Sequence, residues 1–359
     1  MDPATLIPTP DVIPVHWGWF QLLLLVTFFM HILLMNVMVG TAFIAAVSHF
    51  YRDGGSSPAT TAISEKLPFA IAFAVNFGVA PLLFLQVLYG HFIYTSSILM
   101  AVFWLWIIAM VIAAYYLAYI YKYKYLQLNK GRAILTGLIT LLLLLVGFLF
   151  SNNITMMLQP ETWARYLERP NGLLLNLADP SLWPRYLHFM CSAVAVGGMA
   201  IALFFSYKRH KGESGLQPWI RYGCSWFGYA TFANFWIGAW FAGSLPRGLI
   251  TMDSANGVFL LIFLISAIIT AVFAVVLALR EQVLPACSAL LGTLALMVLV
   301  RDRLRSAYLQ PWFAPDELTV QASYSPLIIF LLFFVFGIAL IVWMLRLTWK
   351  NLDSEEVSS

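Results

Sequence analysis

Long apolar stretches alternate with short polar segments along the whole chain. A helix needs about 20 apolar residues to cross a bilayer, and nine stretches reach or approach that length. Neither of the two longest connecting segments, 159–184 and 301–324, reaches the size of a soluble domain. We therefore predict an all-α fold, a polytopic membrane helix bundle that forms a single domain over residues 1–359. The nine predicted spans are residues 18–46, 68–93, 97–121, 134–158, 185–207, 222–245, 257–279, 284–300 and 325–348.

Composition and charge support this class and predict an orientation. The chain is 62% hydrophobic and only 10% charged, whereas about a quarter of the residues in a soluble domain are charged. With the N-terminus outside, 13 of the 20 Lys and Arg residues, including every lysine, lie in inner loops or the C-terminal tail. Positive residues favour the inner side, so we expect the N-terminus outside and the C-terminus inside. This bias accounts for the net charge of +4, and no nucleic-acid partner is needed to explain it.

The cysteines and acidic residues limit which cofactors and which proton-transfer chemistry we expect. The three cysteines form no CxxC or CxxCH motif, so we expect neither covalently attached c-type haem nor an iron–sulfur cluster. All sixteen acidic residues lie in predicted loops, tails or span ends. Because ionisable groups deep in a membrane are usually functional, their absence predicts that the chain has no carboxylate relay of its own.

The six histidines fall into two groups. A neutral imidazole in hydrocarbon needs a partner for each ring nitrogen. A metal ion and a hydrogen bond are one solution, and polar groups of neighbouring helices are another. We expect solvated His16 and His210 and an interfacial His49, whereas His31, His91 and His188 lie inside spans or at their outer ends.

The surroundings of His188 favour a ligand role. Residues three, four and seven positions later share its helical face, and these are Cys191, Ser192 and Ala195. Such small side chains leave room for a flat macrocycle, but they also permit close helix–helix contact. Both interpretations remain open. Likewise, amides inside the spans, such as Gln86, normally bond to neighbouring helices and could instead contact a propionate or a quinone.

Several motifs follow one another in a recognisable order. Gly40 follows His31 by nine residues in HILLMNVMVG, while Arg185 precedes His188 by three and Gly197 follows it by nine. Together with nine spans and an outer N-terminus, this pattern resembles subunit I of the cytochrome bd-type quinol oxidases. Three further matches are FGVAPLLFLQVLYG at 77–90, NNITMMLQP in the fourth span and Gln310-Pro311-Trp312 after the eighth.

The resemblance implies a haem-bearing scaffold in a bacterial inner membrane, yet the chain departs from the family pattern. The second-span glutamate of the family corresponds to Gln86, and its eighth-span glutamate falls near Leu299, where no acid occurs. The seventh-span methionine ligand has no counterpart, since Met252 precedes that span. The quinol-binding loop is shortened to a turn at about 246–256. These departures argue against oxygen reduction and against quinol oxidation at the usual loop.

We therefore expect the membrane electron-transfer subunit of a quinone-linked respiratory oxidoreductase. It would bind one or two b-type haems near the outer face and exchange electrons between the quinone pool and other membrane or periplasmic redox subunits, such as a multihaem cytochrome c. His91 would replace the missing methionine opposite His188. The alternatives are a diverged terminal quinol oxidase subunit and a haem-free quinone-binding or anchor subunit. The expected cofactor-binding residues are His188, His31, His91, Ser192, Asn152, Gln86 and Arg185, the three histidines being the metal ligands.

Overall fold

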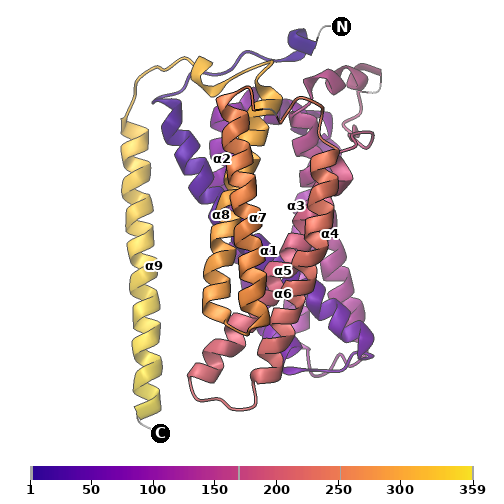
Figure 1. Ribbon diagram of the computed structural model, residues 1–359, viewed down its shortest axis with the longest axis vertical. Coiled ribbons are helices and arrows are strands. Elements are labelled where there is room, and N and C mark those ends of the chain that lie inside the picture. Colours follow the sequence, from indigo (N-terminus) through magenta and orange to yellow (C-terminus); the bar gives the residue numbers. More distant parts are fainter. Residues whose placement is uncertain (1–2, 169, 251, 358–359) are drawn as a thin grey trace.

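The chain folds into a bundle of helices that run up and down along one long axis (Figure 1). The computed structural model describes residues 3–168, 170–250 and 252–357. Arg169, one of the seven arginines predicted on the outer side, lies outside this description. The helices are α1 (Trp17–Tyr51), α2 (Pro58–Leu99), α3 (Ala101–Tyr123), α4 (Gly131–Met157), α5 (Leu182–His210), α6 (Gln217–Gly243), α7 (Ala255–Leu279), α8 (Val283–Leu309) and α9 (Ser325–Val357), with short 3-10 helices at Pro3–Leu6, Pro160–Glu168 and Pro315–Glu317.

Eight of these α-helices are long and apolar enough to cross a membrane, which confirms the all-α membrane bundle. The exception is α6, which occupies the sixth predicted span. It is 27 residues long, but its glycines, polar residues and amphipathic aromatic rings lower its hydropathy. Nine spans therefore remain a prediction, as does the orientation.

Three helices, α2, α8 and α9, extend nine or more residues beyond their predicted spans. α2 begins at Pro58 because Ser57 caps it, with its hydroxyl accepting a hydrogen bond from Thr60 N at 3.2 Å, and proline is favoured in the first turn. α8 continues to Leu309, nine residues past the predicted end at 300. The charged segment after residue 300, predicted to be a loop, is therefore helical.

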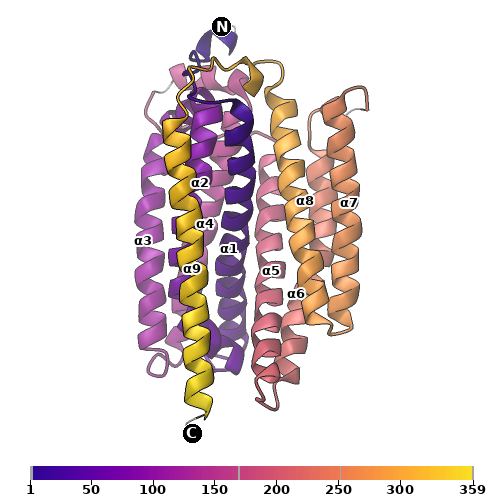
Figure 2. The same cartoon turned by 90° about the vertical axis from the view of Figure 1, so that its left-hand side faces the viewer.

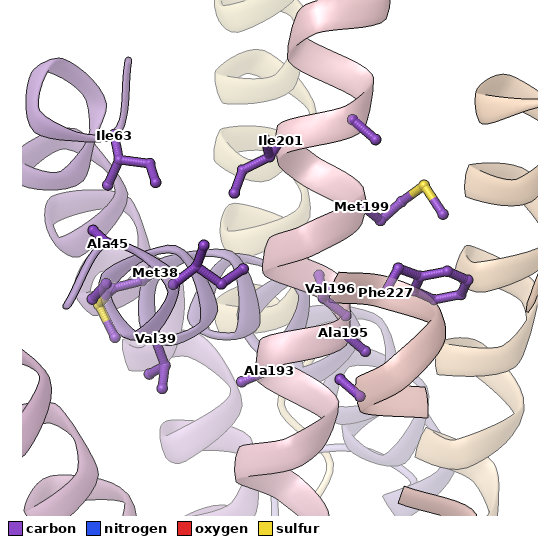
Figure 3. Packing of buried hydrophobic residues seen from close by; sticks show 14 of the residues in the cluster. Met38, Val39, Ala45, Ile63, Ala193, Ala195, Val196, Met199, Ile201 and Phe227 are labelled. Carbon is purple, nitrogen blue, oxygen red and sulfur yellow. The ribbon is translucent and has the colours of Figure 1, made fainter. Parts of the chain in front are cut away.

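The middle of the bundle is held together by close approach of α5 to its neighbours. A Cβ atom on Gly197 would lie 2.5 Å from the carbonyl carbon of Gly40 in α1. A Cβ atom on Gly198 would lie 2.7 Å from the backbone nitrogen of Phe227 in α6. Glycines thus set both crossings, as small residues do in membrane bundles. In Figure 3, Val39 of α1 and Phe227 lie on opposite sides of α5.

His49 corrects one expectation at the end of the bundle opposite the N-terminus. It is completely buried rather than interfacial. Its Nδ1 lies 3.0 Å from the Gly55 carbonyl oxygen, and its Nε2 lies 2.8 Å from the Tyr121 hydroxyl. Because a carbonyl oxygen only accepts, Nδ1 donates to Gly55, and the Tyr121 hydroxyl also donates to the Thr60 carbonyl at 3.2 Å. Both nitrogens are satisfied inside the protein, so His49 is a structural residue.

The N-terminal segment and the connection between α8 and α9 lie together across the other end (Figure 2). Ile13 N donates to Thr319 O, and Gln321 N donates to Ile13 O, each at 2.9 Å. Beyond this connection α9 stands apart from the other helices (Figure 1). Phe330 packs edge-on against Phe84 of α2, but most of the described α9 side chains further along are exposed.

Candidate functional site

Arginine side chains gather inside the bundle near the N-terminal end. Arg185 of α5 and Arg305 of α8 are each only 5% exposed, and Arg301 of α8 is partly buried. The three line a small cavity whose remaining walls are apolar side chains of α2, α4 and α8. The predicted site residue Arg185 is therefore part of a cluster. Its two partners were expected to lie in an outer loop, because the apolar pattern ends at residue 300.

The positive charge of this cluster is only partly balanced. Asp302, 1% exposed, pairs with Arg305 and with Arg303 at 2.9 Å, and it accepts a hydrogen bond from Gln21 at 2.5 Å. Neither Arg185 nor Arg301 forms an ion pair with any residue that the structure describes. A buried charge without a close counterion is costly, although Asp179 lies near enough to interact with Arg185. The cavity, of about 10 Å³, has room for no more than about one water molecule.

Asp302 is also a correction. It was expected in a loop, one turn beyond Leu299, but it lies inside α8. Its carboxylate is occupied by the neighbouring guanidinium groups and by Gln21, so it is held as a structural counterion rather than free to relay protons. Asp179, the other buried acid near this end, accepts hydrogen bonds from Ser181 N at 3.0 Å and from Ser181 Oγ at 2.9 Å.

His188 lies against α6, one aromatic ring away from Arg185. A Cβ atom on Gly238 of α6 would lie 3.2 Å from its Cε1, so the glycine makes room for the ring. The centroids of His188 and Phe241 are 6.3 Å apart, and the Arg185 guanidinium lies 4.9 Å from the same Phe241 ring. Nδ1 of His188 is buried without a hydrogen-bond partner. The side chain therefore retains bonding capacity near Arg185, which forms no ion pair with a described residue.

The small face of His188 is in direct contact with α6. Asn234 donates to Ser192 Oγ at 2.8 Å, and the Cys191 thiol donates to the Ala230 carbonyl at 3.2 Å. Of the two interpretations of this face, the structure realises the close helix–helix contact. Ser192 belongs to that contact, although the Oδ1 atom of Asn234 is left without a hydrogen-bond partner.

His31 lies against α2, where Gly78 makes room for it. A Cβ atom there would lie 2.9 Å from the ring. Nδ1 of His31 donates to the Ala74 carbonyl at 3.0 Å. This bond fixes the tautomer and leaves the Nε2 lone pair free to bind a metal, an arrangement common among metal-binding histidines. The centroid of the His31 ring lies 6.4 Å from that of Phe28, and the Arg301 guanidinium lies 4.2 Å from the centroid of the Phe28 ring.

His91 has different neighbours and is not brought together with His188. Its ring is flanked by Phe92 and by Phe313 of the α8–α9 connection, with both pairs of centroids 4.4 Å apart. It lines a second cavity, together with Gln86. The proposed pairing of His91 with His188 across one haem therefore gains no support from the geometry.

Asn152 has a structural position. It is completely buried, and its Oδ1 accepts a hydrogen bond from the Asn176 backbone at 3.1 Å, which anchors the connection between α4 and α5. Its Nδ2 is left without a partner. Asn152 therefore anchors a connection, whereas Gln86, the other amide among the predicted cofactor-binding residues, lines a cavity.

The described donor set does not suit a bare metal ion. Within the described ranges, no three His, Cys, Asp or Glu side chains converge on a point that could hold a metal. Haem supplies the porphyrin nitrogens itself and asks the protein for one or two axial ligands. Its two propionates would need cationic partners, and Arg185 and Arg301 form no ion pair with a described residue. The sequence contained one signal for this cluster. If the helix continues past residue 300, Arg301 and Arg305 lie four residues apart and share one helical face.

No family model matches the chain, and neither a curated protein nor a solved structure matches it. The resemblance to subunit I of the cytochrome bd-type oxidases therefore remains a prediction.

Proposed function

We propose that this protein is a membrane electron-transfer subunit that binds b-type haem and links the quinone pool to a partner redox protein. One observation carries the proposal. Two histidines with bonding capacity, His31 and His188, each lie one phenylalanine ring away from an arginine that forms no ion pair with a described residue. At two places in the bundle, that combination would provide a ring nitrogen for the iron and a cationic partner for a propionate.

The chain's own residues would bind and orient the cofactor. His31 would offer Nε2, because Ala74 holds Nδ1. His188 would offer a ring nitrogen beside Asn234, and Arg301 and Arg185 would pair with propionates. A haem held in this way supplies an iron that changes between the ferric and ferrous states, one electron at a time. The apolar helices around it would exclude water.

The proposed setting is a bacterial inner membrane that the chain crosses nine times, with the N-terminus outside. The arginine cluster then lies towards the outer face. Electrons would pass between the quinone pool and another membrane or periplasmic subunit, for which a multihaem cytochrome c is a suitable class. The support for this orientation is the distribution of Lys and Arg.

We further propose that the subunit does not reduce oxygen. Gln86 replaces a family carboxylate and lines the second cavity rather than the arginine cluster. Asp302, the buried acid nearest in sequence to the missing eighth-span glutamate, is already paired. A haem-free anchor subunit is the second candidate, and the direct contact of α6 with the His188 face favours it.

An optical spectrum of the purified protein, reduced minus oxidised, tests the proposal. We expect a b-type spectrum that decreases by a discrete fraction in His188→Ala and again in His31→Ala. His210→Ala, at the exposed last residue of α5, is the control and should leave it unchanged. Absence of a haem spectrum would exclude the proposal and leave the anchor subunit. Oxygen consumption with a reduced quinol would contradict its second part.

A further inference from the structure

The second cavity is separate from the arginine cluster and has a volume of about 200 Å³. Its floor is the face of α2 between Gln86 and Ile98, and its roof is the N-terminal segment Pro8–Asp11 with Leu318 of the α8–α9 connection. Figures 1 and 2 show these two connecting segments crossing this end of the bundle. The cavity is thus assembled from three parts of the chain that are distant in sequence.

Polar groups of complementary kinds line this cavity. Gln86 can donate and accept hydrogen bonds, Asp11 and Tyr94 add a carboxylate and a hydroxyl, and His91 adds an imidazole. His91 is only 8% exposed, and its Nε2 has no hydrogen-bond partner. Leaving a buried ring nitrogen unpaired is unfavourable, so the cavity has an unmet need for a polar ligand.

The cavity faces the side of the bundle rather than the water-covered end. Val87, Tyr94 and Ile98 on its rim are 37%, 50% and 63% exposed on the outer surface of α2. In a membrane such positions face lipid, while the N-terminal segment covers the end. A ligand would therefore arrive from the lipid phase. The volume is below the usual range of about 300–1,000 Å³ for sites that enclose a whole ligand, so it suits one ring whose tail stays in the lipid.

The cavity is also adjacent to the arginine cluster. α2 departs from helical geometry at Tyr89, whose backbone angles are φ −132° and ψ 30°. The Tyr89 ring lies 4.5 Å from the Arg305 guanidinium and contacts Phe313, which in turn packs edge-on against His91. Two aromatic rings therefore separate His91 from the cluster.

We propose that this cavity binds the headgroup of a lipid-soluble quinone or quinol. Gln86 and His91 bond to the ring oxygens, and the isoprenoid tail leaves between the exposed side chains of α2. The proposal rests on the proposed function, because it places the quinone site of that electron-transfer subunit. It concerns binding only, and it differs from a site in the connection between α6 and α7.

Photolabelling of the haem-loaded protein in detergent tests the location. An azido derivative of decylubiquinone is irradiated with the protein, and labelled peptides are mapped by mass spectrometry. We expect the label within Pro8–Asp11 or Gln86–Ile98 and its loss on addition of excess decylubiquinone. Label in residues 244–254, or label that excess quinone does not displace, would overturn the proposal.

Two variants with matched controls test the contacts. In Gln86→Leu and His91→Phe, the dissociation constant for decylubiquinone, measured by calorimetry, should rise roughly tenfold or more. Gln127→Leu and His210→Phe make the same changes at exposed positions and should bind like the wild type. Equal binding by all four variants, or no binding by the wild type, would contradict the site.

The two proposals fail separately. A normal haem spectrum in Gln86→Leu and His91→Phe shows that these variants have folded. If that spectrum is present but quinone binding is insensitive to both changes, the cavity assignment is wrong and the haem proposal stands. If the wild type lacks haem but the label still maps to the cavity, the haem proposal fails and the cavity assignment stands.

Discussion

At the scale of single residues, Arg301 is the most informative position. Its guanidinium stacks on Phe28 beside His31 and has no acidic partner among the described residues. A unit charge about 10 Å from an iron contributes about 1.7 kcal/mol at an effective dielectric constant near 20. Removing it in Arg301→Gln should therefore lower the reduction potential of one haem, because the oxidised iron carries the extra positive charge.

The expected shift is on the order of 70 mV for a one-electron couple, and a redox titration followed by optical spectroscopy measures it. Arg247→Gln is the control, since Arg247 is exposed at the same end of the bundle. Potentials that are identical in both variants would show that Arg301 is remote from any haem.

The pair between Asp302 and Arg305 makes a second prediction, for stability. Both side chains are buried, so Asp302→Asn leaves a guanidinium without its counterion and should cost about 3–5 kcal/mol. Asp53→Asn is the control, because its ion pair with Lys130 is 75% and 78% exposed and is worth about 0–1 kcal/mol. Thermal unfolding in detergent measures both. A similar loss in the two variants would mean that the Asp302 pair is solvated.

The residues that sequence reasoning found and missed differ in a physical way. His188 and Arg185 could be selected because they interrupt or border an apolar run. Arg301 and Arg305 could not be selected from hydropathy, which places charged residues in loops. In the structure both lie over aromatic rings, and Arg305 also pairs with Asp302. His49 was misassigned for a related reason, since its partners Gly55 and Tyr121 come from two other segments.

At the scale of helices, the crossing of α1 and α5 predicts a strong response to added volume. A methyl group on Gly40 would overlap the backbone carbonyl of Ala193, which cannot move as a side chain can. Gly40→Ala should destabilise the protein by roughly 1–3 kcal/mol or more. Gly137→Ala in α4 is the matched control, since nothing lies within 4 Å of the added atom. Equal melting temperatures of the two variants would exclude this tight crossing.

The contact between α6 and the turn joining α7 to α8 predicts that the stability of the protein depends on pH. Arg221 donates to Glu281 at 2.8 Å, and Gln217 also donates to this carboxylate. The hydrogen bond from Arg221 is the main cause that lowers the pKa of Glu281 below its ordinary value of 4.5. A lowered pKa means that the stabilisation is complete above 4.5 and is lost as the pH falls through the value in the folded protein.

The difference in melting temperature between the wild type and Glu281→Gln should therefore be constant near neutral pH and shrink below pH 4.5. Glu213→Gln is the control, since its pair with Lys208 is exposed on both sides, and its difference should stay small throughout. A difference for Glu281→Gln that persists unchanged at the lowest pH would show that ionisation of the carboxylate is unimportant.

Helix positions followed from the apolar pattern, but helix ends did not. The early start of α2 depends on the Ser57 cap, and the late end of α8 depends on burial of charges by other helices. α6 shows the opposite limitation. It is fully helical and closely packed on α5, although its composition alone does not mark it as a span.

At the scale of the whole molecule, the all-helical membrane class could be predicted, while helix neighbours could not. A span of apolar residues states that a helix crosses the membrane, but it does not state which helices touch. The contact of the His188 face with α6 and the enclosure of His91 by the N-terminal segment are both tertiary. Because the sequence does not specify such contacts, it allowed the hypothesis that His91 pairs with His188. The geometry does not support that pairing.

The orientation of the molecule is a prediction that the fold makes testable at both ends. Successive helices alternate in direction (Figure 1), so the turns at 52–57, 124–130, 211–216 and 280–282 share one end. Most of the lysines cluster at or near this end, which should therefore be cytoplasmic.

A fluorescent protein fused after Ser359 should fold and fluoresce, and alkaline phosphatase at the same place should be inactive. Phosphatase fused after residue 175, in the connection between α4 and α5, should be active. The reverse pattern would place the arginine cluster near the cytoplasm and would remove the argument for a periplasmic electron partner.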